Sequence, residues 1–131
     1  METKLELRAV EVGVDAEQFT PRYSVLSVGF ALSSEDALLI QRAFGEDAEE
    51  SEELCLVRSP SQECVYEPFV RVHLARKCLE ILLTSEAAQE FGAKAISISF
   101  SLQEPQFVQV KEAMANAFTG RGFYADGEYE A

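Results

Sequence analysis

The sequence predicts an α+β fold: a mostly antiparallel sheet of about seven strands, with a short helix and a C-terminal helix packed on one face. Three observations favour this class. Apolar and polar residues alternate with a period of two along most of the chain, which is typical of half-buried strands. Short turns join the alternating segments and favour antiparallel pairing. Helical patterns follow only after the strands. We expect one domain over residues 1–122 and an acidic C-terminal tail over residues 123–131.

The first half of the chain is predicted to form strands. Residues 5–14 alternate, but the alternation slips by one position, which indicates a β-bulge. Thr20-Pro21 marks a turn, and residues 23–32 complete an N-terminal hairpin with a longish loop. Residues 37–44 contain three consecutive apolar residues, which fit a helical turn or a buried strand, and we favour the strand. A short strand follows at residues 54–58.

The second half adds a hairpin and two helices. Alternation over residues 69–83 predicts a tight β-hairpin. Thr84 and Ser85 are good N-caps for a two-turn helix that Gly92 ends. Residues 95–102 alternate again, and Pro105 suits the first turn of a longer helix. That helix carries an apolar stripe of five residues: Phe107, Val110, Met114, Ala117 and Phe118.

Composition limits the possible partners and the compartment. The formal net charge is −12, so the chain repels nucleic acid and anionic membranes. It has no apolar run near the roughly 20 residues of a membrane span and no secretory signal, so we expect a cytoplasmic protein. Its three cysteines are widely spaced and odd in number, which favours reduced thiols packed as small hydrophobes, with a redox or metal role as the alternative.

The acidic residues are concentrated in the middle of the chain. Between Glu35 and Glu67 lie ten acidic and two basic residues, which together carry −8 of the −12 charge. Such a run is either a solvated loop or a surface for a basic partner, and both readings stay open. The second reading makes six residues candidates for partner binding: Glu46, Asp47, Glu49, Glu50, Glu52 and Glu53.

The sequence contains few residues that could form a catalytic site. His73 is the only histidine, and its place in an alternating segment is typical of a half-exposed strand residue. The acidic run has no glycine at the spacing that a calcium loop needs, and the chain has no second histidine, so we expect no metal. The glycines at 120 and 122 follow a helix instead of opening one, so we expect no phosphate-bearing cofactor and, in all, no cofactor. We therefore expect no enzyme. Two alternatives remain: an enzymatic or small-ligand pocket formed by Cys64, Tyr66 and His73, and a homo-oligomer that pairs exposed strand edges.

Several segments resemble the immunity-protein-10-like family of bacterial polymorphic toxin systems. They are DALLIQR at residues 36–42, the hairpin at residues 69–83, and a serine-rich strand at residues 96–100 between the two helices. The resemblance runs from residue 23 to residue 118. It implies a small cytosolic protein that binds the toxin encoded beside it and blocks it. Our hypothesis is that the protein does so by occluding the toxin's active or substrate site.

The resemblance supplies no toxin-contacting residues, so the six acidic residues are our own candidates. A cognate toxin that they attract would be basic, and nucleases are one such kind. Carboxylates can occupy the positions that substrate phosphates would take on such an enzyme.

Overall fold

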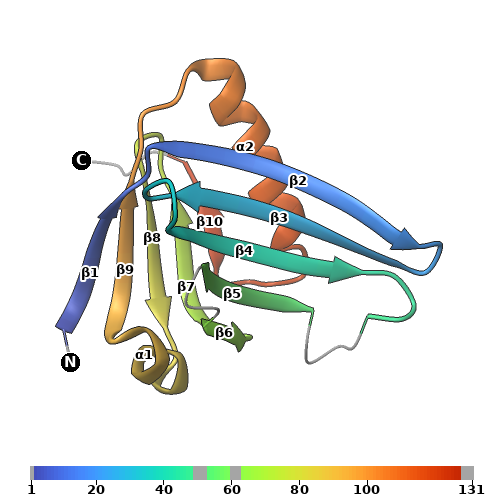
Figure 1. The fold of residues 1–131 in the computed structure, drawn as a ribbon, viewed down its shortest axis with the longest axis horizontal. Coiled ribbons are helices and arrows are strands. Elements are labelled where there is room, and N and C mark those ends of the chain that lie inside the picture. The colour runs from blue at the N-terminus through green and yellow to red at the C-terminus, as the bar shows by residue number, and fades with distance from the viewer. Residues whose placement is uncertain (1, 49–52, 60–62, 128–131) are drawn as a thin grey trace.

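The computed structural model describes residues 2–48, 53–59 and 63–127. Within these ranges the chain forms ten strands in two five-stranded sheets, together with two helices (Figure 1). The α+β class, the short helix and the C-terminal helix are confirmed. The prediction of a single sheet is wrong. The strands form two sheets, and the apolar faces of these sheets pack against each other in one core.

Five consecutive strands form one sheet, and the first strand joins the last four in the other. Sheet I has the order β1-β9-β8-β7-β10, with the bounds β1 (Glu2–Arg8), β7 (Phe69–Leu74), β8 (Cys78–Leu83), β9 (Ala93–Ser99) and β10 (Tyr124–Asp126). Sheet II is the meander β2-β3-β4-β5-β6, with the bounds β2 (Glu11–Thr20), β3 (Tyr23–Ala31), β4 (Ala37–Phe44), β5 (Leu54–Ser59) and β6 (Glu63–Tyr66). The helices are α1 (Ser85–Phe91) and α2 (Glu104–Ala117).

The slip in the N-terminal alternation marks a crossing between the sheets. The Ala9 N–H donates to the Ser99 carbonyl of sheet I at 2.8 Å, and the Val10 N–H donates to the Ala31 carbonyl of sheet II at 2.8 Å. The expected β-bulge is therefore wrong, because a one-residue change of phase turns the apolar face from one sheet toward the other. The hairpin of β2 and β3 is confirmed, but its connection is tight, with Thr20 opposite Tyr23.

The predicted mostly antiparallel pairing is confirmed, but two strand pairs at the edges of sheet I are parallel. β1 lies parallel to β9, and β10 lies parallel to β7. β10 occupies part of the segment that we expected to be a tail, because Phe123 and Tyr124 pack against the ring of Phe118. Residues 128–131 lie outside the described ranges.

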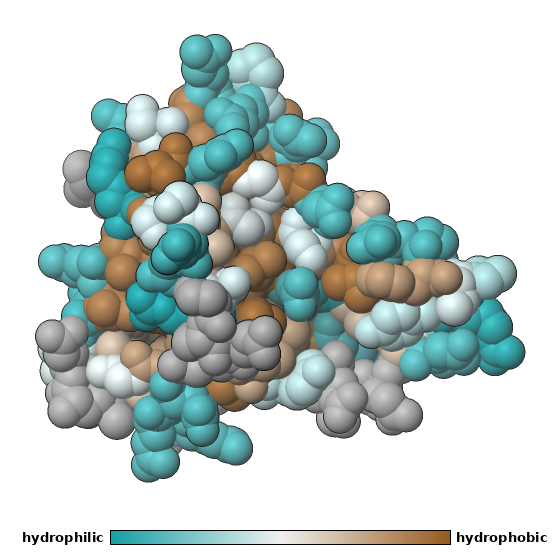
Figure 2. All heavy atoms as spheres, in the orientation of Figure 1, coloured by the Kyte–Doolittle hydropathy of each residue, from teal (hydrophilic) through white to brown (hydrophobic). Residues whose placement is uncertain are grey.

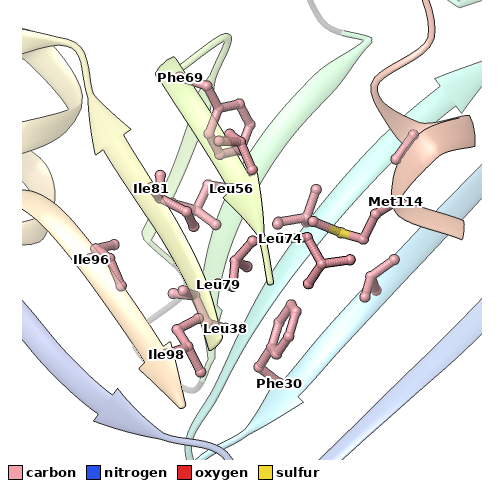
Figure 3. Packing of buried hydrophobic residues seen from close by; sticks show 14 of the residues in the cluster. Phe30, Leu38, Leu56, Phe69, Leu74, Leu79, Ile81, Ile96, Ile98 and Met114 are labelled. Atoms are coloured by element: carbon pink, nitrogen blue, oxygen red, sulfur yellow. The ribbon is translucent and has the colours of Figure 1, made fainter. Parts of the chain in front are cut away.

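The core lies between the two sheets and α2. Figure 3 shows Phe30, Leu38 and Leu56 of sheet II directed toward Leu74 and Leu79 of sheet I. Helix α2 lies on the inner face of sheet II against β2, β3 and β4, as expected for a C-terminal helix on one face. Among the described residues, no helix has the length and apolar character needed to cross a membrane.

The short helix ends where the sequence predicts. The Thr84 hydroxyl accepts a hydrogen bond from the Ala87 N–H at 3.2 Å, which satisfies a free donor of the first turn. Gly92 ends the helix in the left-handed region, with φ of 76°.

Candidate partner-binding surface

The acidic segment, residues 45–53, joins β4 to β5 at the end of sheet II that also carries the β2–β3 turn (Figure 1). The structure describes three of the six candidate residues: Glu46, Asp47 and Glu53. The other three, Glu49, Glu50 and Glu52, lie outside the described residues.

The first part of the acidic segment is held against the β2–β3 turn by Arg22. Its guanidinium lies 3.0 Å from the Glu46 carboxylate and 3.6 Å from the Asp47 carboxylate. Gly45 permits this approach, because its φ is 111° and a Cβ there would collide with the Arg22 carbonyl. The side chains of Glu46 and Asp47 remain 77% and 54% exposed, so they can meet a partner directly.

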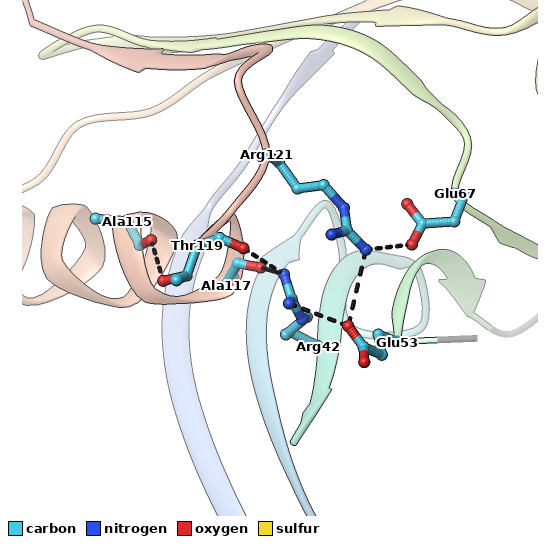
Figure 4. Close-up of polar contacts among 7 residues, drawn as sticks. All are labelled: Arg42, Glu53, Glu67, Ala115, Ala117, Thr119 and Arg121. Atoms are coloured by element: carbon cyan, nitrogen blue, oxygen red, sulfur yellow. Dashed lines mark hydrogen bonds and ion pairs between the residues drawn. The ribbon is translucent and has the colours of Figure 1, made fainter. Parts of the chain in front are cut away.

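Glu53, at the other end of the segment, is bound inside the protein. Its carboxylate lies 3.1 Å from the Arg42 guanidinium and 3.8 Å from that of Arg121, and Arg121 also pairs with Glu67 (Figure 4). Only 24% of the Glu53 side chain is exposed. Glu53 therefore differs from Glu46 and Asp47: it anchors the segment to the core.

Arg42 connects this anchor to helix α2. It is 8% exposed, and one guanidinium nitrogen donates to the Ala117 carbonyl at 2.9 Å and to the Thr119 carbonyl at 3.1 Å. These carbonyls lie at the C-terminal end of the helix, where a cation is favoured by the helix dipole. Arg42 thus holds β4, the start of β5 and the end of α2 in one arrangement (Figure 4).

A groove lies beside the acidic segment, between the end of α2 and the inner face of β2, β3 and β4. Its volume is about 390 Å³. Its lining combines the charged Glu17 with polar and apolar residues, among them Gln18, Ser24, Leu26, Phe44, Asn116 and Thr119. The sequence analysis missed this groove, because its lining comes from segments far apart in the chain and none of them carries a motif.

The pocket that we considered as an alternative is not assembled. Cys64 and Tyr66 lie on β6 of sheet II, whereas His73 lies on β7 of sheet I. His73 lines a hollow of about 250 Å³ together with Arg71 and Glu80, all from sheet I. Within the described residues, no group of three or more His, Cys, Asp or Glu side chains is arranged to hold a metal ion.

The three cysteines are free thiols in different environments. Cys55 is buried, Cys64 is exposed and Cys78 is half-buried. Burial, followed by the neighbouring Cys64, raises the pKa of the Cys55 thiol to about 12. Above pH 9.0, the ordinary pKa of a thiol, Cys55 ionises in the unfolded chain but stays protonated in the folded one. The free energy of unfolding therefore falls as the pH rises from about 9 to about 12.

We expect the Cys55 thiol to resist alkylation at pH 8. In a variant that keeps Cys55 alone (Cys64→Ser, Cys78→Ser), labelling in native buffer should be at least about a hundredfold slower than labelling in denaturant, since the thiolate is the reacting form. The control keeps Cys64 alone (Cys55→Ala, Cys78→Ser) and should label readily when folded. Rapid native labelling of Cys55 would contradict the assigned burial.

The fold and the charge pattern define a small acidic α+β protein with a two-sheet core. The chain belongs to the immunity protein 10 family, whose model matches residues 8–108. This match confirms the resemblance found in the sequence, and it contains all of sheet II and the acidic segment. Comparison with curated proteins and with solved structures found no match.

Proposed function

We propose that this chain is an immunity protein that binds a cognate bacterial toxin and neutralises it by occluding its active or substrate site. The family match to residues 8–108 supports this function. Immunity proteins generally act by binding, and the alternative pocket of Cys64, Tyr66 and His73 is not assembled in the fold.

The observation that carries the proposal is the acidic segment at the exposed end of sheet II. The side chains of Glu46 and Asp47 are mostly exposed, and six of the eight residues from 46 to 53 are acidic. Like charges so close together repel one another, and a basic partner would relieve this repulsion. The expected partner is therefore a basic toxin, with a nuclease as one candidate kind.

The anchoring of the segment at both ends suits this role. Arg22 holds Glu46 and Asp47 through exposed ion pairs, which contribute little and exchange readily for a partner's cations. Arg42 holds Glu53 through a largely buried pair. The Asp47 N–H also donates to the Arg22 carbonyl at 3.1 Å. The backbone at both ends of the segment therefore keeps its place on the fold when a toxin approaches.

Neutralising the acidic segment is expected to slow toxin association. The test variant replaces five carboxylates with amides and keeps Glu53: Glu46→Gln, Asp47→Asn, Glu49→Gln, Glu50→Gln and Glu52→Gln. Its association rate with the product of the neighbouring toxin gene should fall by about tenfold or more at low salt, because steering acts through unscreened charge. At about 0.5 M salt the difference should nearly vanish.

The control neutralises five exposed carboxylates elsewhere and so has the same net charge: Glu6→Gln, Glu86→Gln, Glu90→Gln, Glu104→Gln and Glu112→Gln. It should associate much faster than the test variant at low salt. Equal rates for the two variants would remove the acidic segment from the mechanism. If the unmodified protein does not bind the toxin, the proposed function is wrong.

A further inference from the structure

The outer face of sheet II has a centre without charged side chains. Odd-numbered residues of β3, β4 and β5 point outward, because the even-numbered Val28, Phe30, Leu38, Ile40, Leu54 and Leu56 are buried in the core. We call these twelve residues (the odd numbers in 23–31, 37–43 and 55–59) the neutral panel; ten of them are half-buried, and Ala43 and Cys55 are buried. None of its twelve members is charged, although 26% of the whole chain is.

The strand register makes the panel continuous. Gly29 lies opposite Leu39, and Leu39 lies opposite Val57, so that these residues form one row across three strands. The next row joins Ser27, Gln41 and Cys55. Figure 2 shows brown and white surface over much of sheet II, with teal patches between them and along the borders.

The panel departs from the usual pattern of an antiparallel sheet. Such a sheet packs one face on the core and presents polar side chains on the other. The outer face of sheet I follows this rule: Lys4 pairs with Glu80 at 3.3 Å, and Arg71 lies on the neighbouring strand. On sheet II, Val25, Leu39 and Val57 instead remain only half-buried. Helix α2 packs against the inner face of sheet II, opposite the panel, where its buried residues join the core.

Carboxylates border the panel on two sides. On the edge strand β2, Glu11, Asp15 and Glu17 point outward and are exposed, and they lie beside Ala31, Ser27 and Val25 of the panel. At the end of β4, the panel residue Ala43 is followed by Phe44 and then by the acidic segment, which begins at Gly45. A charge-depleted centre with a charged rim is the anatomy of a protein–protein interface.

We propose that the neutral panel is the surface that the toxin covers, with the carboxylates of β2 and of Glu46 and Asp47 meeting a basic rim on the toxin. This inference rests on the proposed function and deepens it by naming the docking surface. The acidic border selects a basic partner over a second copy of this chain, because face-to-face copies would bring like-charged borders together.

The test places one negative charge in the centre of the panel. Leu39→Glu adds to the acidity of the protein, so steering of a basic toxin is retained while a carboxylate is buried on binding. We expect dissociation from the product of the neighbouring toxin gene to become at least about tenfold faster. The matched control is Leu82→Glu, which makes the same substitution on the outer face of sheet I, where Leu82 is 38% exposed. Its dissociation rate should stay within about twofold of the original.

Val57→Glu serves as the second panel variant, and the urea unfolding midpoint of each variant establishes that it is folded. Equal dissociation rates for the panel variants and Leu82→Glu would overturn the inference and leave the proposed function standing. Failure of the unmodified protein to bind the toxin would overturn both. A dimer of the unmodified chain that Leu39→Glu converts to a monomer, seen by sedimentation without toxin, would assign the panel to self-association and overturn the toxin as its occupant.

Discussion

Replacing Phe118 with alanine is expected to lower the free energy of unfolding by about 4 kcal/mol, because it removes a buried aromatic ring and leaves a cavity. Phe118 is 2% exposed at the end of α2. Its ring lies edge-on to Phe69 of β7 at 5.3 Å and is stacked on Tyr124 of β10 at 4.9 Å. A third ring, Phe123, lies 5.8 Å away. One side chain thus joins the helix to two strands of sheet I.

Urea unfolding of Phe118→Ala measures this loss. The control is Val108→Ala on the same helix, where the side chain is 42% exposed and the expected loss is below about 1 kcal/mol. Because β10 depends on the aromatic contacts, hydrogen exchange of the Tyr124 and Gly127 amides should accelerate in Phe118→Ala. Similar unfolding energies for the two variants would contradict the central place of this ring cluster.

Replacing Arg42 with methionine is expected to lower the free energy of unfolding by about 3 kcal/mol, because breaking a buried pair leaves its partners without their cation. The carbonyls of Ala117 and Thr119 would lose their shared donor, and Glu53 would keep only Arg121 at 3.8 Å. Methionine retains much of the apolar stem, so the loss reports the polar contacts more than a cavity.

The control for Arg42→Met is Arg58→Met. Arg58 pairs with Asp36 at 3.0 Å, but both side chains are more than one quarter exposed, so the expected loss is at most about 1 kcal/mol. Arg42→Lys should recover part of the stability, because it keeps the charge but lacks the forked donor geometry. Equal unfolding energies for Arg42→Met and Arg58→Met would show that the Arg42 contacts contribute little.

Local features of the sequence predicted most of the elements correctly. Residues 37–44 form a strand, because their apolar residues pack in the sheet and the next segment provides a partner. Thr84 and Gly92 bound the short helix because hydroxyl capping and left-handed glycine are effects of a few neighbouring residues. The slip near Ala9 was visible in the sequence but misinterpreted, since a bulge and a crossing between sheets produce the same change of phase.

The candidate site was predicted only in part. The charge of the acidic segment is a property of composition, so the sequence alone reveals it. The different position of Glu53 depends on Arg42 and Arg121, which reach it from another strand and from beyond α2. No local pattern separates Glu53 from Glu46, because both are glutamates in the same run.

By itself, the sequence determined most of the strands, both helices and the concentration of negative charge, because these follow from periodicity and composition over short stretches. Only the tertiary structure decided that the strands divide into two sheets, that β10 closes an edge of sheet I, and that the neutral panel faces outward. The physical reason is that both faces of β3, β4 and β5 are poor in charge. Contacts with Leu74, Leu79 and helix α2, made across long separations in the chain, select which face is buried.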